Sequence, residues 1–542
     1  MISAFEYGKT IENIAQPRQG LASGNNNRFY RTWQEIDYSK LILNASSKEE
    51  VWKRKKKYVP VNKGGGYCKW YGNNYEVIKF DENNYNKLLS MGNHLPSRDK
   101  YFLPGVTWGK IASSGFSCRF SPKGFVFTDS GMKITGDEKQ LKYICGFLQS
   151  VIAPCFLKVF SETIHFETGN IARLPVFETE KFDEIVSAVE KNIDLAKTDW
   201  DSFEISWDFK KHPFIYNTEI IKIAYDNWKS ECLERIYNVK SNDEYINQLF
   251  IDIYGLQNVL TPEEKDEDIT VHKADVERDI RSFISYAVGC MFGRYSLDVD
   301  GLVYAGGVWD SSKYKTFIPD VDNVIPITDE EYLDDDIVGR FVKFIKVVYG
   351  EKTLEENLTF IANALGGKGK SSREVIRNYF LKDFFKDHCK TYQKRPIYWL
   401  YDSGKQNGFK ALVYLHRMDE NTTGKVRADY LHHMEQIYAN EVSRMQDVID
   451  HSKSAHEVSV AEKRMDKLKK QIKECQDYDA KLGHLALDQI KLNLDDGVKV
   501  NYRKAQTGRD GKFYEVLADS KNIMANDALW KEYLTEWPHE DE

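Results

Sequence analysis

The residues best suited to chemistry lie between positions 52 and 80, where cations, glycines and flat side chains occur together. Cations neutralise phosphates, glycines let a backbone approach a ligand closely, and aromatic rings pack on sugars or bases. The pattern indicates a surface that faces nucleic acid, or else a solvated basic turn before a glycine-rich hairpin of core aromatics. The candidate residues here are Lys53, Arg54, Lys55, Lys56, Lys57, Lys63, Gly64, Gly65, Lys69, Trp70, Tyr71, Asn73 and Asn74.

Two further segments carry the same residue types. A loop rich in glycine and asparagine at 16–33 contributes Arg18, Asn26, Arg28 and Arg31, and a basic-aromatic segment at 391–417 contributes Lys394 and Arg395. Phosphates would be contacted by the run at 53–57 with Arg28 and Arg31. Bases would be read by Arg18, Lys69, Asn73 or Asn74, since arginine and lysine pair with guanine and asparagine pairs with adenine.

The composition is that of a soluble protein with several domains. The chain has 542 residues, of which 42% are hydrophobic and 29% are charged, so two to four domains with real cores are expected. The eight cysteines form no C-x-x-C pair, which gives no sign of a metal site or a disulfide framework and favours a reducing cytosol. No signal peptide or membrane span is expected, and we predict a cytoplasmic location.

The charge is distributed unevenly along the chain. The net charge is −7, but residues 1–175 carry 25 lysines and arginines against 15 acidic residues, a net of +10. Residues 176–542 therefore carry −17. Because charges are screened beyond about 10 Å at ordinary salt, a basic domain can hold DNA while an acidic remainder stays soluble or docks elsewhere.

The hydrophobic pattern predicts an α/β and α-helical multidomain protein. Short runs at 75–80, 106–111, 115–120 and 124–127 are typical of strands, and 141–159 is typical of one helix. A mixed α/β domain is followed by helical domains and a coiled-coil-like helical hairpin. The expected domains are a recognition domain at 1–175, a mostly helical connecting domain at 176–390, a basic-aromatic hairpin segment at 391–430, a helical hairpin or coiled coil at 431–482 and a tail region at 483–542.

Helix signals beyond residue 175 are local and specific. A helix at 230–256 should end at Gly255, and Thr261 with Pro262 should begin another. The stretch ALGGKGKS at 364–371 approaches a phosphate-binding P-loop, but Ser371 and Glu374 form a capping box for a helix at 373–385. We therefore expect no nucleotide hydrolysis there.

Several long strings occur in one order along the chain. They include RQGLASGNNNRFYRTW, GGGYCKWYGNNYEVI, TWGKIASSGFSCRFSPKGFVF, HFETGNIARLPV and TYQKRPIYWLYDSGKQNGFKALVYLHR. They resemble the target-recognition and C-terminal regions of the PglX family, large adenine-specific DNA methyltransferases of bacteriophage exclusion (BREX) systems. The resemblance implies N6-methylation of adenine in a defined sequence, S-adenosylmethionine as methyl donor, and double-stranded DNA and other BREX proteins as partners. It also implies that the cytoplasm in question is bacterial.

The chain departs from this family in the residues of the chemistry. The family carries an Asn/Asp-Pro-Pro-Tyr/Phe motif that holds a flipped adenine, but none of the 13 prolines here are adjacent. We expect a DNA-recognition part with no catalytic, cofactor or metal site, completed by a methyltransferase catalytic domain in cis or in trans. The alternatives are a split-enzyme subunit, an inactive truncated specificity cassette, a fragment, or a protein-binding scaffold of a defence complex.

Overall fold

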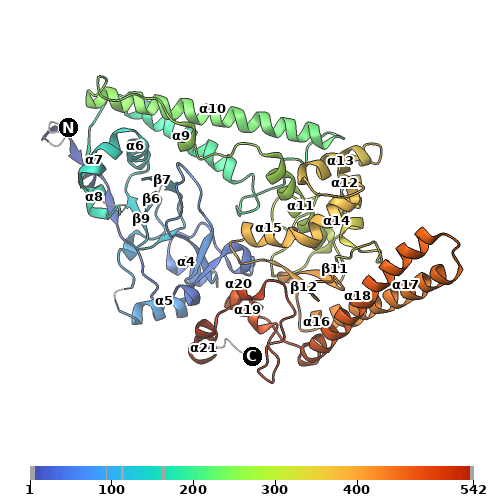
Figure 1. Ribbon diagram of the computed structural model, residues 1–542. Coiled ribbons are helices and arrows are strands. Elements are labelled where there is room, and N and C mark those ends of the chain that lie inside the picture. The colour runs from blue at the N-terminus through green and yellow to red at the C-terminus, as the bar shows by residue number, and fades with distance from the viewer. Residues whose placement is uncertain (1–5, 93, 112–114, 161–164, 538–542) are drawn as a thin grey trace. The chain divides into compact units, whose positions relative to one another are not determined.

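The computed structural model describes residues 6–92, 94–111, 115–160 and 165–537 (Figure 1). Two stretches that carry predictions, 112–114 in the third family-like string and 538–542 of the tail region, lie outside these residues. The chain folds into two compact units, the first made of 1–33, 38–209 and 227–274, the second of 34–37, 210–226 and 275–542. The first unit continues past residue 175, where the sequence changes character. Helices combine with several small sheets, which confirms the predicted fold class.

The first sheet of the first unit is antiparallel, with strand order β2-β9-β6-β7. Alternate residues such as Val106, Trp108 and Ile134 enter a hydrophobic core, so the residues between them face the opposite side. The expected strands at 106–111 and 115–120 are confirmed in shorter form. The strands are β2 (Gln16–Arg18), β6 (Gly105–Gly109), β7 (Cys118–Ser121) and β9 (Gly131–Thr135).

The second sheet has the order β3-β5-β4-β8 and its own hydrophobic core. Strand β8 joins β4 in parallel, and the other pairs are antiparallel. Helix α5 begins after Asp81, whose carboxylate accepts the Asn84 N–H at 3.2 Å, and it places Tyr85 and Leu88 in that core. The elements are β3 (Tyr30–Thr32), β4 (Tyr58–Asn62), β5 (Glu76–Lys79), β8 (Val126–Phe127), α3 (Asn26–Phe29), α4 (Lys48–Lys53) and α5 (Glu82–Ser90).

The single helix expected at 141–159 is wrong, because two helices form there. Helices α6 (Glu138–Gln149) and α7 (Ile152–Phe160) meet at 77°. Pro154 lacks an N–H and its ring would clash with the carbonyl of Ser150, so the chain becomes extended at Ser150 and restarts. Among the described residues, no single helix is long and apolar enough to cross a membrane, and α6 and α7 pass that test only as this bent pair.

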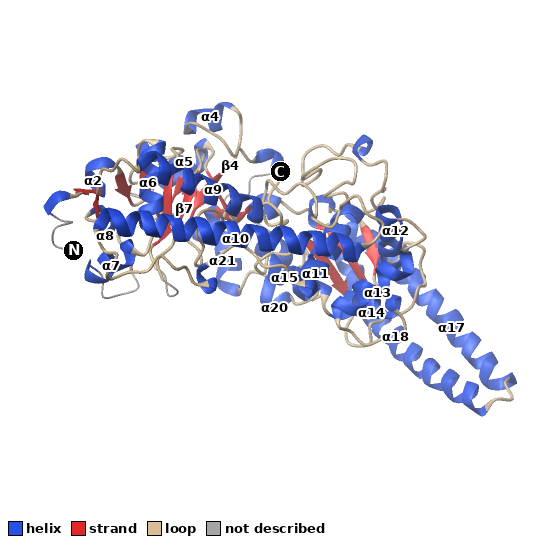
Figure 2. Ribbon diagram, turned by 90° about the horizontal axis from the view of Figure 1, so that it is seen from above, coloured by secondary structure: helices blue, strands red, loops and turns tan. Residues whose placement is uncertain are grey.

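Helix α9 (Phe182–Trp200) lies beside α10 (Ile221–Tyr254) in both views (Figures 1 and 2). The predicted end of α10 is confirmed, since Gly255 follows it with φ of +65°. The helix expected from Thr261 is wrong. The Thr261 hydroxyl does accept the Glu263 N–H at 3.3 Å, but only the 3₁₀ turn Asp266–Asp268 follows. The smaller elements are β1 (Lys9–Thr10), which pairs with β10 (Pro175–Val176), α2 (Ile11–Ile14) and α8 (Thr168–Ala172).

The second unit packs helices around an antiparallel sheet of order β11-β13-β12. The hairpin predicted in the basic-aromatic segment is confirmed as β12 (Tyr398–Asp402) and β13 (Lys410–Tyr414), whereas β11 (Val324–Pro326) had no sequence signal. The helices before the hairpin are α11 (Val276–Phe292), α12 (Ile337–Tyr349), α13 (Leu354–Leu365), α14 (Ser372–Lys382) and α15 (Phe384–Thr391).

The capping box at Ser371 is confirmed. Its hydroxyl accepts the Glu374 N–H at 3.2 Å, and the Glu374 carboxylate accepts the Lys370 N–H at 2.6 Å. Helix α13 precedes this segment and ends at Gly366, which has φ of +64°. A P-loop follows a strand, so this geometry explains the glycines as a helix end.

The helical hairpin is also confirmed, with its break at 452–454 between α17 (His432–His451) and α18 (Ala455–Asp488). Ala461, Leu468 and Cys475 form part of its buried seam. Figure 2 shows the hairpin projecting from the rest of the second unit. It begins with α16 (Thr422–Lys425) and a π-helical turn (Val426–Leu431), and it is followed by α19 (Val498–Lys504), α20 (Ser520–Ile523) and α21 (Asp527–Glu536).

Candidate nucleic-acid interface

The basic run at 53–57 follows α4 and presents two free lysines. Lys53 and Lys55 are exposed, and their side-chain amines have no hydrogen bond or ion pair within the described residues. Lys55 has φ of +52°, so the chain turns at this residue. The others are engaged or half-buried: Arg54 pairs with Glu50 at 2.8 Å, Lys56 donates to the Ser39 carbonyl at 2.5 Å, and Lys57 is half-buried.

A glycine loop at residues 63–66 follows β4. Gly64 and Gly65 have φ of +86° and +119°, backbone conformations that residues other than glycine rarely adopt. The Asn73 amide donates to the Gly66 carbonyl at 3.0 Å and so holds the far end of the loop. The Lys63 amine lies 3.0 Å from the Glu76 carboxylate and over the Tyr30 ring. The loop is therefore shaped by its own neighbours, and Gly65 and Gly66 are exposed.

Lys69 lies in a buried ion cluster. Its amine lies 2.8 Å from both Asp243 and Glu264, and its side chain is 4% exposed. Burial opposes the charge on Lys69, but the two carboxylates outweigh it and raise its pKa. Burial raises the pKa of Asp243 to about 6, and the second carboxylate, Glu264, acts in the same direction. Lys69 acts in the opposite direction. The cluster joins the segment at 67–74 to α10.

The other predicted residues of this segment are also buried. The Trp70 side chain enters the core of the first sheet, and the backbone N–H of Trp70 donates to the Cys118 carbonyl at 3.2 Å. Tyr71 lies in the same core, and the Lys197 amine sits 5.4 Å from its ring centre. Asn74 is 7% exposed. These three side chains therefore support the segment from within.

The predicted residues of the N-terminal loop also include both exposed and buried side chains. Arg18 and Asn26 are exposed, and Asn26 accepts a hydrogen bond from the Ser23 hydroxyl at 2.7 Å. Arg28 is half-buried beside Phe29. The Arg31 guanidinium is 3% exposed and donates to the carbonyls of Asn27 at 2.7 Å and Tyr30 at 2.6 Å.

Of the two cations predicted in the second basic-aromatic segment, one is exposed. Lys394 is exposed, with φ of +59°. Arg395 lies 2.6 Å from the Glu35 carboxylate, whose other oxygen accepts the Val498 N–H at 2.7 Å. Arg395 thereby ties residues 34–37 to the second unit.

A row across the first sheet contains two cations that were not predicted from the sequence, Lys133 and Arg119. The strand register places Arg18, Lys133, Thr107 and Arg119 side by side on one face. Lys133 is fully buried, and its amine has no hydrogen-bond partner within the described part of the chain but lies 5.9 Å from the centre of the Phe127 ring. Burial lowers the pKa of Lys133 to about 7. Arg119 is 3% exposed. Only the pairing of four strands reveals this row, since the residues are far apart in sequence.

The positive charge of residues 1–175 is balanced within the folded unit. Over its ranges the first unit has 33 lysines and arginines and 33 aspartates and glutamates. Much of the acid comes from α9, α10 and the segment at 263–268. The net charge of the unit therefore gives no general attraction to a polyanion, and only local groups of cations could attract one.

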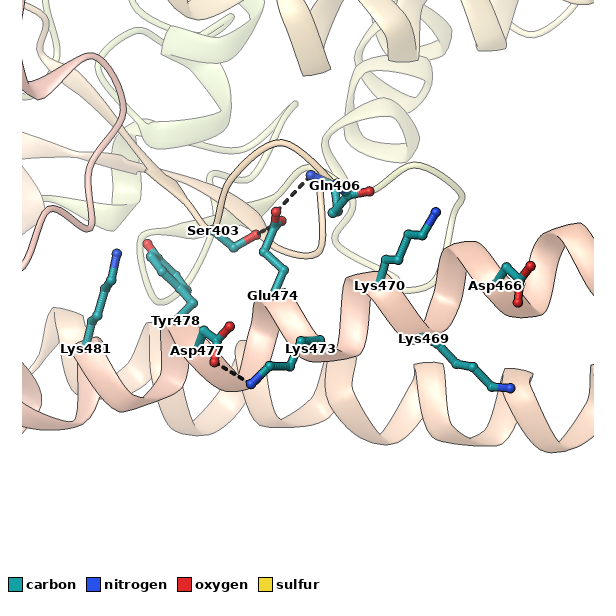
Figure 3. Close-up of a pocket in the computed structure, with 10 residues that line it drawn as sticks. All are labelled: Ser403, Gln406, Asp466, Lys469, Lys470, Lys473, Glu474, Asp477, Tyr478 and Lys481. Atoms are coloured by element: carbon teal, nitrogen blue, oxygen red, sulfur yellow. Dashed lines mark hydrogen bonds and ion pairs between the residues drawn. The ribbon is translucent and has the colours of Figure 1, made fainter.

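A groove of about 730 Å³ lies along α18 beside the β12–β13 turn (Figure 3). Glu474 holds the turn, because its carboxylate accepts the Ser403 hydroxyl at 2.7 Å and the N–H groups of Gln406 at 2.8 Å and Gly408 at 3.0 Å. Four lysines line the groove, together with Asp466 and Asp477. They are Lys469, Lys470, Lys473 and Lys481, of which Lys473 pairs with Asp477 at 2.8 Å.

Comparison with known proteins places this geometry in context. The chain is 40% identical over 513 residues to adenine-specific methyltransferase PglX of Lacticaseibacillus casei (strain Zhang), which is 92% of this chain and 42% of that protein. The predicted resemblance to PglX is confirmed. Adenine-specific methyltransferase BrxX of Escherichia coli O9:H4 (strain HS) is 34% identical over 540 residues, covering 93% of this chain and 43% of that protein. The chain thus spans less than half the length of PglX or BrxX, and no family model matches it.

Proposed function

We propose that this chain is the sequence-specific DNA-recognition part of an adenine-N6 DNA methyltransferase that marks self DNA in phage defence. The observation that carries the proposal is the similarity of nearly the whole chain to 42% of PglX. The Asn-Pro-Pro-Tyr type of motif needs two adjacent prolines, which this sequence does not have. Methyl transfer would then require the remaining part of such an enzyme, with S-adenosylmethionine bound there.

The surface that would meet DNA is led by exposed cations of the first unit. Lys53 and Lys55 would contact phosphates, and Arg18 and Asn26 are exposed for further contacts. The buried residues of the 67–74 segment would position the glycine loop without touching bases. In the second unit, Lys394 and the lysines of the α18 groove offer a separate surface for the same backbone.

The test begins with the whole chain, labelled duplex DNA and fluorescence anisotropy. We expect binding that weakens steeply as salt rises, and a salt slope that falls by about one for each of Lys53→Gln and Lys55→Gln. Lys87→Gln, at an exposed lysine of α5, is the matched control for the loss of one charge. Salt-independent binding, or no binding, would favour a scaffold that contacts other defence proteins.

The second arm of the test concerns the chemistry. The chain alone should neither bind S-adenosylmethionine nor transfer labelled methyl groups to DNA. Adding the rest of a PglX-type enzyme should give site-specific methylation, because alignment of the base with the methyl donor supplies much of the rate, roughly 7 to 11 kcal/mol in favourable cases. Methylation by this chain alone would contradict the proposal.

A further inference from the structure

Arg119 carries a buried positive charge with little to balance it. The only hydrogen bond of its guanidinium in the described structure runs from Nη2 to the Gly64 carbonyl at 2.9 Å. Burial lowers the pKa of Arg119, and the groups that act against this effect are the thiols of Cys68 and Cys118, not carboxylates. A guanidinium has five N–H donors in a fork that fits oxyanions, so most of its capacity is unused.

The glycine loop beside Arg119 has free backbone donors. The N–H groups of Gly64, Gly65 and Gly66 have no acceptor among the described residues. Gly64 and Gly65 both have positive φ, and successive amides in turn conformations form concave sites for anions. A Cβ atom added at Gly66 would meet no atom within 4 Å, so there is space above the loop.

The cation row strengthens the local field. Arg119 lies across from Thr107, which lies across from Lys133, and Arg18 completes the row at the exposed edge. Burial alone lowers the pKa of Lys133, without any acidic group acting on it. A buried charge without a partner is costly, and an anion at its side offsets that cost.

We propose that the exposed backbone amides of Gly65 and Gly66, with Arg119 bound behind them to the Gly64 carbonyl, form a binding site for a phosphate oxyanion. This inference rests on the proposed function in one respect: when the protein is on DNA, the anion is a backbone phosphodiester. Arg119 fixes the loop through the Gly64 carbonyl and supplies the charge, while the amides supply directed hydrogen bonds. The site positions the loop on the duplex and does not read a base.

Substitutions at Gly66 test the site without disturbing the core, because the added side chain meets open space. Gly66→Glu should weaken duplex binding roughly five- to tenfold at about 0.1 M salt, as expected for the loss of one phosphate contact. Gly66→Lys should strengthen binding. Gly169→Glu, at an exposed glycine of α8 where an added Cβ would also meet no atom within 4 Å, should leave binding unchanged and is the matched control. Equal affinities of the glutamate and lysine variants would overturn the placement of the loop on DNA.

Arg119→Met tests the buried charge, with folding checked by circular dichroism. Inorganic phosphate should raise the Tm of the unsubstituted protein more than chloride does at matched ionic strength. The methionine variant should lose this difference and bind DNA more weakly, yet stay folded with an equal or higher Tm in chloride. A variant that unfolds in chloride would assign Arg119 a structural role and overturn the proposal.

The two experiments separate this site from the proposed function. If the unsubstituted protein does not bind DNA but phosphate stabilises it through Arg119, the oxyanion site stands and the DNA-recognition role fails. If DNA is bound but neither Gly66→Glu nor Arg119→Met changes the affinity, the DNA-recognition role stands and the site fails. The proposal is refuted if phosphate does not stabilise the unsubstituted protein more than chloride does and both variants bind DNA as the unsubstituted protein does.

Discussion

Replacing Lys69 by methionine should destabilise the first unit strongly and in a way that depends on pH. The amine lies 2.8 Å from both Asp243 and Glu264, whose side chains are 2% and 9% exposed. Removing one member of a buried ion cluster typically costs about 3–5 kcal/mol, because the remaining charges stay buried without compensation. We expect a loss of this size at pH 7.5.

The pH dependence follows from the carboxylates. The pKa of Asp243 is raised to about 6 by burial, although Lys69 lowers it, so in the variant it should rise further. The folded variant would then keep a proton on this carboxyl that the unfolded chain, with an ordinary pKa of about 3.9, releases. Since each pKa unit is worth about 1.4 kcal/mol, holding this proton costs about 5 kcal/mol at pH 7.5 and about 1.5 kcal/mol at pH 5. The defect should shrink on acidification.

Hydrogen exchange of peptides from α10 measures this defect locally, at pH 7.5 and pH 5. Lys197→Met is the matched control, since its amine also faces two carboxylates, Asp201 at 2.5 Å and Asp208 at 2.9 Å, but the side chain is 40% exposed. The control should lose about 1 kcal/mol or less. If Lys69→Met left exchange unchanged but altered the DNA sequence preferred in a selection experiment, Lys69 would be a base reader and the structural argument would be refuted.

Three further predictions concern the second unit. Lowering the pH from 7.5 to 5 should destabilise it, because burial lowers the pKa values of His212, His388 and His416 to about 3. The stability that these neutral histidines contribute is fully present above the unfolded pKa of about 6.5 and decreases as the pH drops below that value. The loss is about 2 kcal/mol for each histidine at pH 5, and a denaturation midpoint that does not change with pH would contradict this prediction. Ser371→Ala should cost about 1 kcal/mol in urea denaturation through its lost cap, and an unchanged midpoint would contradict the capping box. Lys370→Ala should leave ATP titrations in a calorimeter at background, whereas ATP binding abolished by this change would revive the P-loop interpretation.

Features fixed by neighbouring residues could be predicted from the sequence. The capping box at Ser371, the strands of the β12–β13 hairpin and the break between α17 and α18 each depend on a few adjacent side chains. The helix that was expected after Thr261 and does not form shows the limit of prediction from neighbouring residues. The hydrogen bond expected at Thr261 forms. However, Glu264 accepts a hydrogen bond from Lys69, 195 positions away, and the Pro262 carbonyl accepts one from the Asn247 amide. Tertiary contacts that no local pattern contains decide the outcome there.

The residue types of the candidate site did not determine which of its side chains are exposed and which are buried. The glycine loop and the free lysines at 53 and 55 lie in the stretch that the residue types indicated. The same residue types fit the burial of Lys69 and Trp70 equally well, because a basic-aromatic pattern is shared by surfaces and by satisfied cores. Arg119 stood out in no motif, since its importance comes from strand register and from the absence of an acid beside it in the described structure.

Glu474 makes one side chain responsible for the shape of a loop more than sixty positions earlier. Its carboxylate accepts hydrogen bonds from three donors of the β12–β13 turn, which no neutral side chain of the same length can accept so well. In evolution, the length of the turn and the residue at position 474 should therefore change together. We expect relatives that lengthen or shorten the turn to change the acid as well, and relatives that keep the acid to keep the turn.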